Sequence, residues 1–121
     1  MALSIKGIPD ARYYWGVDGN VKPWALIPGT SDYPGPGTPG GYIITAAAVE
    51  LIRIVGVCLA GFVQPTSAVI YYPQLTVGTA ATPVGGVTQF ELQYFVATTG
   101  VEAAANVNLT GSIATVLVFG Y

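Results

Sequence analysis

The sequence predicts a single all-β domain, a β-sandwich of seven or eight short strands with a jelly-roll-like arrangement around one core. Three observations lead to this prediction. The chain has 121 residues, which is the size of one domain. Turn-forming residues recur at short intervals, and the segments between them favour Val, Ile, Thr, Tyr and Phe, which are common in strands. We therefore expect one domain over residues 1–121, with the strand order left open.

The first element is a hairpin within YYWGVDGNVKPW. The tripeptide DGN tolerates the backbone conformations of a tight turn, so strands are expected at 13–17 and 21–26. Pro23 has no N–H to donate to a neighbouring strand. The second strand of this hairpin is therefore predicted to lie at a sheet edge.

An extended loop rich in proline and glycine is predicted over residues 28–41, and it contains most of SDYPGPGTPGGY. Alternating proline and glycine give a stiff segment that has already lost part of its unfolded freedom, so docking it costs less entropy. We expect it to contribute little to the core and to clasp a neighbouring molecule. Its expected interface residues are Tyr33, Pro34, Pro36, Pro39 and Tyr42.

The segment AAAVELIRIVGVCLAGF is ambiguous in its first half, because residues 46–54 fit either a helix or a strand. Thr45 could cap a short helix in which Glu50 pairs with Arg53. The β-branched residues that follow favour a strand for the second half. Cys58, the only cysteine, has apolar neighbours and is expected to be a buried, inert thiol.

Two further strands are expected in the second half of the chain. SAVIYYPQLTV contains Pro73, which predicts an edge or a bulge. From Thr88 the chain alternates regularly, which predicts one core face and one solvated face. The core face is expected to carry Phe90, Leu92, Tyr94 and Val96, and the solvated face Gln89, Glu91 and Gln93.

The last strand lies within VNLTGSIATVLVFGY and becomes apolar on both faces toward its end. Strands with this pattern are usually covered on both sides. The end of the chain is therefore expected to be ordered, with Val116, Val118 and Tyr121 covered or in an interface.

Charged residues make up only 8% of the chain, against about 25% in typical globular domains. Hydrophobic residues make up 52%, and the net charge of −2 protects only weakly against association. We therefore expect a homo-oligomer, a trimer or a dimer. IVGVCLAGFV is about half as long as a membrane-spanning helix, and the basic, apolar start of a secretory signal is missing. No membrane partner is expected, and synthesis is expected in a reducing cytosol.

The residue types argue against catalysis. Histidine is absent, which excludes Ser-His and Cys-His nucleophiles, and one cysteine cannot build a zinc site. GPGTPGG lacks the lysine of a phosphate-binding loop. Four basic residues are scattered among six acidic ones, which does not suit nucleic acid. The sequence predicts no enzyme, no cofactor, no metal and no nucleic-acid partner.

The stretch YYWGVDGNVKPWALIPG resembles a hairpin opening of phage structural proteins, with the pattern G-V-D-x-x-G followed by K, P and an apolar stretch. Gly16, Val17 and Asp18 match, Gly19 stands one place early, and Lys22 and Pro23 follow. Together with the size, β content and low charge, the chain resembles the small decoration, or cement, proteins of tailed bacteriophages. The match covers under a fifth of the chain.

This resemblance implies a non-enzymatic β-sandwich on the capsid exterior, made in the host cytoplasm. Such proteins stabilise the shell by bridging neighbouring major capsid subunits. Two alternatives remain open: a phage fibre or tail module that binds a host glycan, and a small self-assembling shell or tube subunit. Against the glycan alternative, no cluster of Asp, Asn or Arg of the kind that fixes sugar hydroxyls is apparent in the sequence.

Overall fold

The structure, a computed structural model, describes residues 3–8, 13–15, 19–37, 40–77 and 86–121. This part of the chain folds into strands with one short 3-10 helix, η1 (Ala47–Val49), and the all-β prediction is confirmed. The strands are β1 (Ser4–Gly7), β2 (Tyr13–Trp15), β3 (Gly19–Ile27), β4 (Tyr42–Thr45), β5 (Ile54–Val63), β6 (Tyr71–Thr76), β7 (Gln89–Val96) and β8 (Ile113–Gly120).

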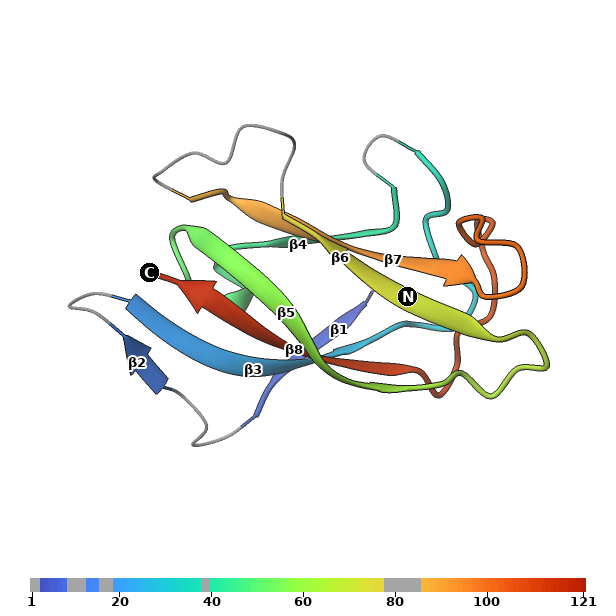
Figure 1. Cartoon of the computed structure of the whole chain (residues 1–121), viewed down its shortest axis with the longest axis horizontal. Coiled ribbons are helices and arrows are strands. Elements are labelled where there is room, and N and C mark those ends of the chain that lie inside the picture. The colour runs from blue at the N-terminus through green and yellow to red at the C-terminus, as the bar shows by residue number, and fades with distance from the viewer. Residues whose placement is uncertain (1–2, 9–12, 16–18, 38–39, 78–85) are drawn as a thin grey trace.

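The strands form two antiparallel sheets that face each other, as the sequence predicts (Figure 1). The large sheet has the order β1-β3-β8-β5, with β2 paired to β3, and the small sheet has the order β4-β7-β6. The last two strands occupy central places, because β7 lies between β4 and β6 while β8 lies between β3 and β5. The sandwich is thus established, and its jelly-roll form stays a prediction.

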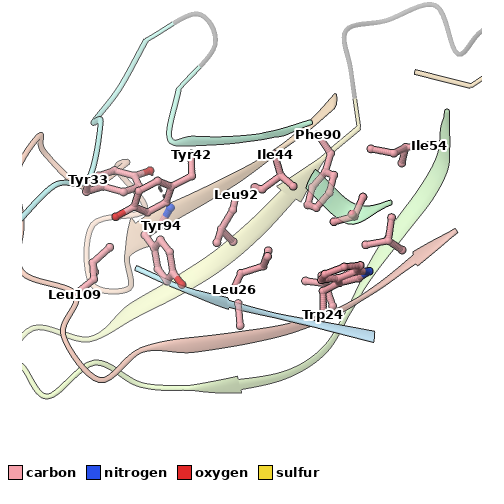
Figure 2. Close-up of a cluster of buried hydrophobic side chains, with 14 of the residues drawn as sticks. Trp24, Leu26, Tyr33, Tyr42, Ile44, Ile54, Phe90, Leu92, Tyr94 and Leu109 are labelled. Atoms are coloured by element: carbon pink, nitrogen blue, oxygen red, sulfur yellow. Dashed lines mark hydrogen bonds between the residues drawn. The ribbon is translucent and has the colours of Figure 1, made fainter. Parts of the chain in front are cut away.

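The core lies between the sheets and is filled by alternate residues of the facing strands (Figure 2). Trp24, Phe90 and Ile54 gather at one end, and three tyrosines gather at the other. Fully burying a large apolar side chain stabilises a fold by roughly 1.5–3 kcal/mol. The predicted inward residues Phe90, Leu92 and Tyr94 are buried, and Val96 is half-buried.

The predicted hairpin is present, since Tyr13 pairs with Val21 and Trp15 pairs with Gly19. Gly19 and Asn20, which were expected in the turn, already belong to β3 and pair with Trp15 and Tyr14, so their placement in the turn is wrong. Residues 16–18 lie outside the described part of the chain. The prediction that Pro23 places its strand at an edge is wrong, because β3 pairs with β8 on one side and with β1 and β2 on the other. The Pro23 carbonyl accepts a hydrogen bond from the Ile8 N–H. The nitrogen and the carbonyl of a residue in an antiparallel strand point to the same side. The Pro23 nitrogen, which has no hydrogen to donate, therefore points to the stretch between the end of β1 and the start of β2.

Residues 46–54 are neither a regular helix nor a strand until Ile54, where β5 begins. The Thr45 hydroxyl accepts a hydrogen bond from the Ala48 N–H, which agrees with its expected capping role at the single turn of η1. Glu50 ends this turn with a left-handed backbone. Its carboxylate pairs with Lys22 at 3.1 Å.

The strand β6 forms an edge of the small sheet among the residues described, which agrees with the prediction from Pro73. On β7 the expected solvated face is only partly correct. Glu91 is buried, because Ile43 of β4 and Thr76 of β6 stand in register on either side of it. A central strand leaves less of its side chains in water than the alternation pattern alone suggests.

The end of the chain is ordered, as predicted. Val116 and Val118 are buried in the core from the central strand β8. The Tyr121 carbonyl accepts hydrogen bonds from the backbone N–H groups of Ile52 and Arg53, and the Tyr121 N–H donates to the Arg53 carbonyl. The final residue is therefore tied to the start of β5.

Candidate functional site

The two tyrosines of the Pro/Gly segment point into the sandwich rather than toward a partner (Figure 2). Tyr33 is 1% exposed and Tyr42 is 6% exposed. Their rings meet edge to face at 5.4 Å, and Tyr33 meets Tyr94 in the same way at 6.0 Å. The expectation that these residues contribute little to the core and anchor a neighbouring molecule is therefore wrong.

Hydrogen bonds hold all three tyrosine hydroxyls. Tyr33 Oη donates to Glu102 Oε2 at 2.6 Å and accepts from the Tyr94 N–H at 2.9 Å. Tyr42 Oη donates to Asp32 Oδ1 at 2.7 Å, and Tyr94 Oη lies 3.0 Å from Ser112 Oγ. These bonds are what allow three phenols to be buried at one end of the core.

Burial shifts the titration of these groups. Desolvation, followed by the hydrogen bond to a carboxylate, raises the pKa of Tyr33 and of Tyr42 well above the usual value. Desolvation raises the pKa of Tyr94 to about 12, although its hydrogen bond with Ser112 acts in the opposite direction. All three hydroxyls remain neutral near neutral pH, which suits a structural role.

The glycines of the segment allow it to pack closely on the rest of the domain. Gly35 has a φ of 86°, and a Cβ there would lie 2.8 Å from the Ala105 backbone nitrogen. Gly41 has a φ of 73° and is pressed against the Leu92 carbonyl. Side chains at these positions would be strained and would collide with backbone atoms. The segment is thus a close-packed cover of one end of the sandwich.

The other expected interface residues fall into three groups. Val116 and Val118 belong to the core and are not available to a partner. Pro34, Pro36 and Tyr121 are exposed, so their role in an interface stays a prediction. Pro39 lies outside the described residues.

One outer surface of the sandwich is apolar, and we call it the apolar sheet face. Residues of β8 that alternate with the buried Ala114, Val116 and Val118 point away from the small sheet, and cross-strand partners share their face. This face carries Val21, Pro23 and Ala25 from β3, Ile113, Leu117 and Phe119 from β8, and Cys58 and Val63 from β5, with Thr115 of β8 as a polar residue among them.

The charges on the apolar sheet face are few and of one sign among the residues described. Lys6 stands in register with Ala25 on β1, and Arg53 pairs with Tyr121 beside β5. They lie at opposite edges of the large sheet. No carboxylate of the described residues stands in register on this face.

Cys58 is exposed on this face, so the prediction of a buried thiol is wrong. The register of β5 shifts between Ile54 and Gly56. Without this bulge Cys58 would share the inward face of Ile54, because side chains alternate along a strand. The bulge turns it outward, opposite Leu117.

The outer surface of the small sheet has a different chemistry, and we call it the polar sheet face. Its rows follow the strand register: Tyr72 pairs with Phe95, Gln74 with Gln93, and Thr76 with Glu91. Ile43 of β4 continues the last row on the other side of Glu91 and is 46% exposed. Glu102 extends the first row through its bridge with Phe95. The rings of Tyr72 and Phe95 are stacked, with centroids 5.5 Å apart and an interplanar angle of 18°.

A chain of hydrogen bonds connects this face to the buried tyrosines. Glu102 accepts from Tyr33 through Oε2 and from Gln93 Nε2 through Oε1, at 2.6 and 3.1 Å. Gln93 Oε1 accepts in turn from the Thr76 hydroxyl at 3.4 Å. A carboxylate and a hydroxyl on opposite ends fix the orientation of the Gln93 amide. Gln93 is therefore held in one position at the surface.

Within the described part of the chain, no group of three His, Cys, Asp or Glu residues gathers to hold a metal ion. No helix there is long and apolar enough to cross a membrane. No family model matches the chain, and no curated protein and no solved structure matches it either. The sequence placed Glu91 and Gln93 on an outward face but not the residues of β6 beside them, and it did not predict the apolar sheet face. The alternation of side chains along β8 and β7 is visible in the sequence. Together with the pairing of these strands, it identifies the residues of both outer faces.

Proposed function

We propose that this protein is a non-enzymatic structural protein that docks on a larger protein assembly through its apolar sheet face, as a capsid decoration protein docks on major capsid subunits. The observation that carries the proposal is the composition of that face. Eight apolar side chains from three adjacent strands lie together on it. Desolvating such residues on docking costs little compared with desolvating unpaired charges.

The size of the face fits an interface. Three strands about 4.8 Å apart, each about eight residues long at about 3.3 Å per residue, present roughly 400 Å². The largest apolar patch on a typical folded monomer is about 300–600 Å² and is often a functional surface, so this face has the size of such a patch. A standard interface takes about 800 Å² from each partner, so this patch would supply its centre and leave room for a polar rim.

The charges at the edges favour a different protein over a second copy of this chain as the occupant. Lys6 and Arg53 stand at opposite edges of the face, and both are cationic. An acidic rim on the partner complements them. A homo-oligomer, trimeric or dimeric, would then associate through other surfaces, while the apolar sheet face meets the capsid or a comparable shell.

The test uses two valines of similar exposure. Val63 is 53% exposed on the apolar sheet face, and Val101 is 62% exposed in the loop after β7. Cosedimentation with the particle that carries the chain should be lost for Val63→Asp and kept for Val101→Asp, with both variants folded. Electron cryomicroscopy of the same particle should find the apolar sheet face against the shell. Equal retention of the two variants, or a particle in which this face is in solvent, would contradict the proposal.

A further inference from the structure

We propose that the polar sheet face is a binding site for a neutral saccharide, independent of docking. The site consists of the ring of Tyr72, the amides of Gln74 and Gln93, and the carboxylate of Glu102. The two outer faces belong to opposite sides of the sandwich, so docking by the large sheet does not cover this face.

The aromatic part of the site is Tyr72. Its ring is stacked on Phe95 across the β6–β7 pair and is 40% exposed. Since β6 is the edge of the small sheet in the described part of the chain, no strand stands beside Tyr72 on the side away from Phe95. The apolar C–H face of a sugar ring can extend this stack, as apolar ligand surfaces do on aromatic side chains.

The polar part of the site is the next row of the sheet. Gln74 and Gln93 stand in register one row from the aromatic pair, which is about 7 Å along the strands. The amide of Gln93 is held by Glu102 and Thr76, and it keeps one N–H for a ligand. Polar groups that are fixed before binding lose little entropy on contact with sugar hydroxyls.

Charge decides the class of ligand. Among the described residues the polar sheet face carries two carboxylates, Glu91 and Glu102, and no cation. Carboxylates accept hydrogen bonds from hydroxyl groups and repel phosphate, sulfate and carboxylate ligands. A face with two carboxylates is also a poor centre for a protein interface, where charged residues are depleted. A neutral, hydroxyl-rich ligand is not repelled by the carboxylates and can donate hydrogen bonds to them.

Pre-organisation links this site to the Pro/Gly segment. A Cβ at Gly40 would lie 2.8 Å from Glu102 Oε1 and 3.0 Å from Gln93 Nε2, so the segment borders the polar row closely. Tyr33, within the same segment, fixes the other oxygen of Glu102. The stiff segment therefore positions the groups that would bind hydroxyls, which gives it a role other than clasping a neighbour.

The experiment tests the isolated full chain on an array of immobilised neutral, sialylated and sulfated oligosaccharides, followed by NMR titration of the side-chain amides with the soluble form of the best neutral binder. Wild-type protein should bind neutral glycans and shift the Gln74 and Gln93 amide signals. Tyr72→Ala should weaken binding about tenfold, as expected for loss of one aromatic contact.

Tyr121→Ala is the matched control, because Tyr121 is 41% exposed and lies outside the polar sheet face. It should bind glycans like the wild type. Tyr72→Phe should keep most of the affinity, and Gln93→Ala should lose it, with unchanged thermal unfolding for Tyr72→Phe. The proposal is overturned by an absence of binding to neutral glycans on the array, by a preference for the sialylated or sulfated ones, or by equal affinity of Tyr72→Ala and Tyr121→Ala.

Discussion

Tyr33 donates a 2.6 Å hydrogen bond to Glu102, which lies 69 positions further along the chain. This one contact joins the Pro/Gly segment to the loop after β7 and continues to Gln93 on the sheet surface. The same hydroxyl accepts the Tyr94 N–H. A single buried phenol therefore satisfies a backbone donor and orients a surface carboxylate.

The first prediction concerns this hydroxyl. Tyr33→Phe removes the hydroxyl that donates to Glu102 and accepts from the Tyr94 N–H. Both groups lose this hydrogen-bond partner, which should lower the free energy of unfolding by about 1–3 kcal/mol. Tyr33→Ala also leaves a cavity and should cost about 3–5 kcal/mol. Chemical denaturation measures both values.

Tyr72→Phe is the control for this series, since Tyr72 is exposed, and it should change stability by no more than about 0.5 kcal/mol. If Tyr33→Phe were as stable as Tyr72→Phe, the bond between Tyr33 and Glu102 would not hold the segment.

The second prediction concerns alkaline pH. Below pH 10 the tyrosines are protonated in both the folded and the unfolded chain, and their contribution is complete. Above pH 10 the unfolded chain releases these protons, while Tyr94 in the folded chain keeps its proton until its pKa of about 12. The free energy of unfolding should therefore fall as pH rises through this range, by roughly 3 kcal/mol from Tyr94.

Tyr33 and Tyr42 act in the same direction, because their pKa values are also raised by burial. Denaturation at several pH values, together with the ultraviolet absorbance of tyrosinate, measures the effect. Tyr94→Phe should reduce the slope. Stability that did not change between pH 10 and 12 would show that these hydroxyls are hydrated in the folded state.

The third prediction concerns Cys58, which is exposed on the apolar sheet face. A disulfide reagent should label it in the free folded protein at a rate close to that of the unfolded chain. If Cys58 were buried and could react only after the protein unfolds, its labelling rate would be lower by a factor of about 1,000 or more. Labelling that required denaturant would place Cys58 in the core. Protection of Cys58 in the assembled particle, compared with the free protein, is the further result expected from the proposed docking.

Regular alternation made part of the fold predictable. Phe90, Leu92 and Tyr94 follow the period of a half-buried strand, and Pro73 marks an edge, so both local patterns agree with the structure. At the apolar end of the chain, Val116 and Val118 are buried as expected, whereas Tyr121 is 41% exposed. These features depend only on the residues of one strand and on their alternation between its two faces, so the sequence of that strand predicts them.

Other features depend on residues that are distant in the chain. Pro23 lies in an interior strand, at a level where β1 has ended and β2 has not begun. Cys58 faces outward because of a bulge, and a shift of one residue reverses every side chain after it. The burial of Tyr33 depends on a carboxylate 69 positions away. The sequence pattern of a single segment does not predict these three features. The full composition of the two outer faces can likewise be identified only when the strand pairing is known.

The fourth prediction concerns the C-terminus. Deletion of residues 118–121 removes the buried Val118 and the last part of β8, which pairs with both β3 and β5 in the centre of the large sheet. It also removes the Tyr121 carbonyl that accepts the N–H groups of Ile52 and Arg53. Burial of one valine contributes roughly 1.5–3 kcal/mol, and the lost strand pairing adds to this, against a total stability of about 5–15 kcal/mol for a domain.

The truncated chain should therefore show no cooperative unfolding transition by circular dichroism. Tyr121→Ala keeps the backbone of the last residue and removes only an exposed ring, so it should fold with a loss of no more than about 1 kcal/mol. A truncated protein with the same denaturation midpoint as Tyr121→Ala would mean that β8 is not needed to its end. The order of the large sheet makes that outcome unexpected, because β8 stands between β3 and β5 and pairs with both.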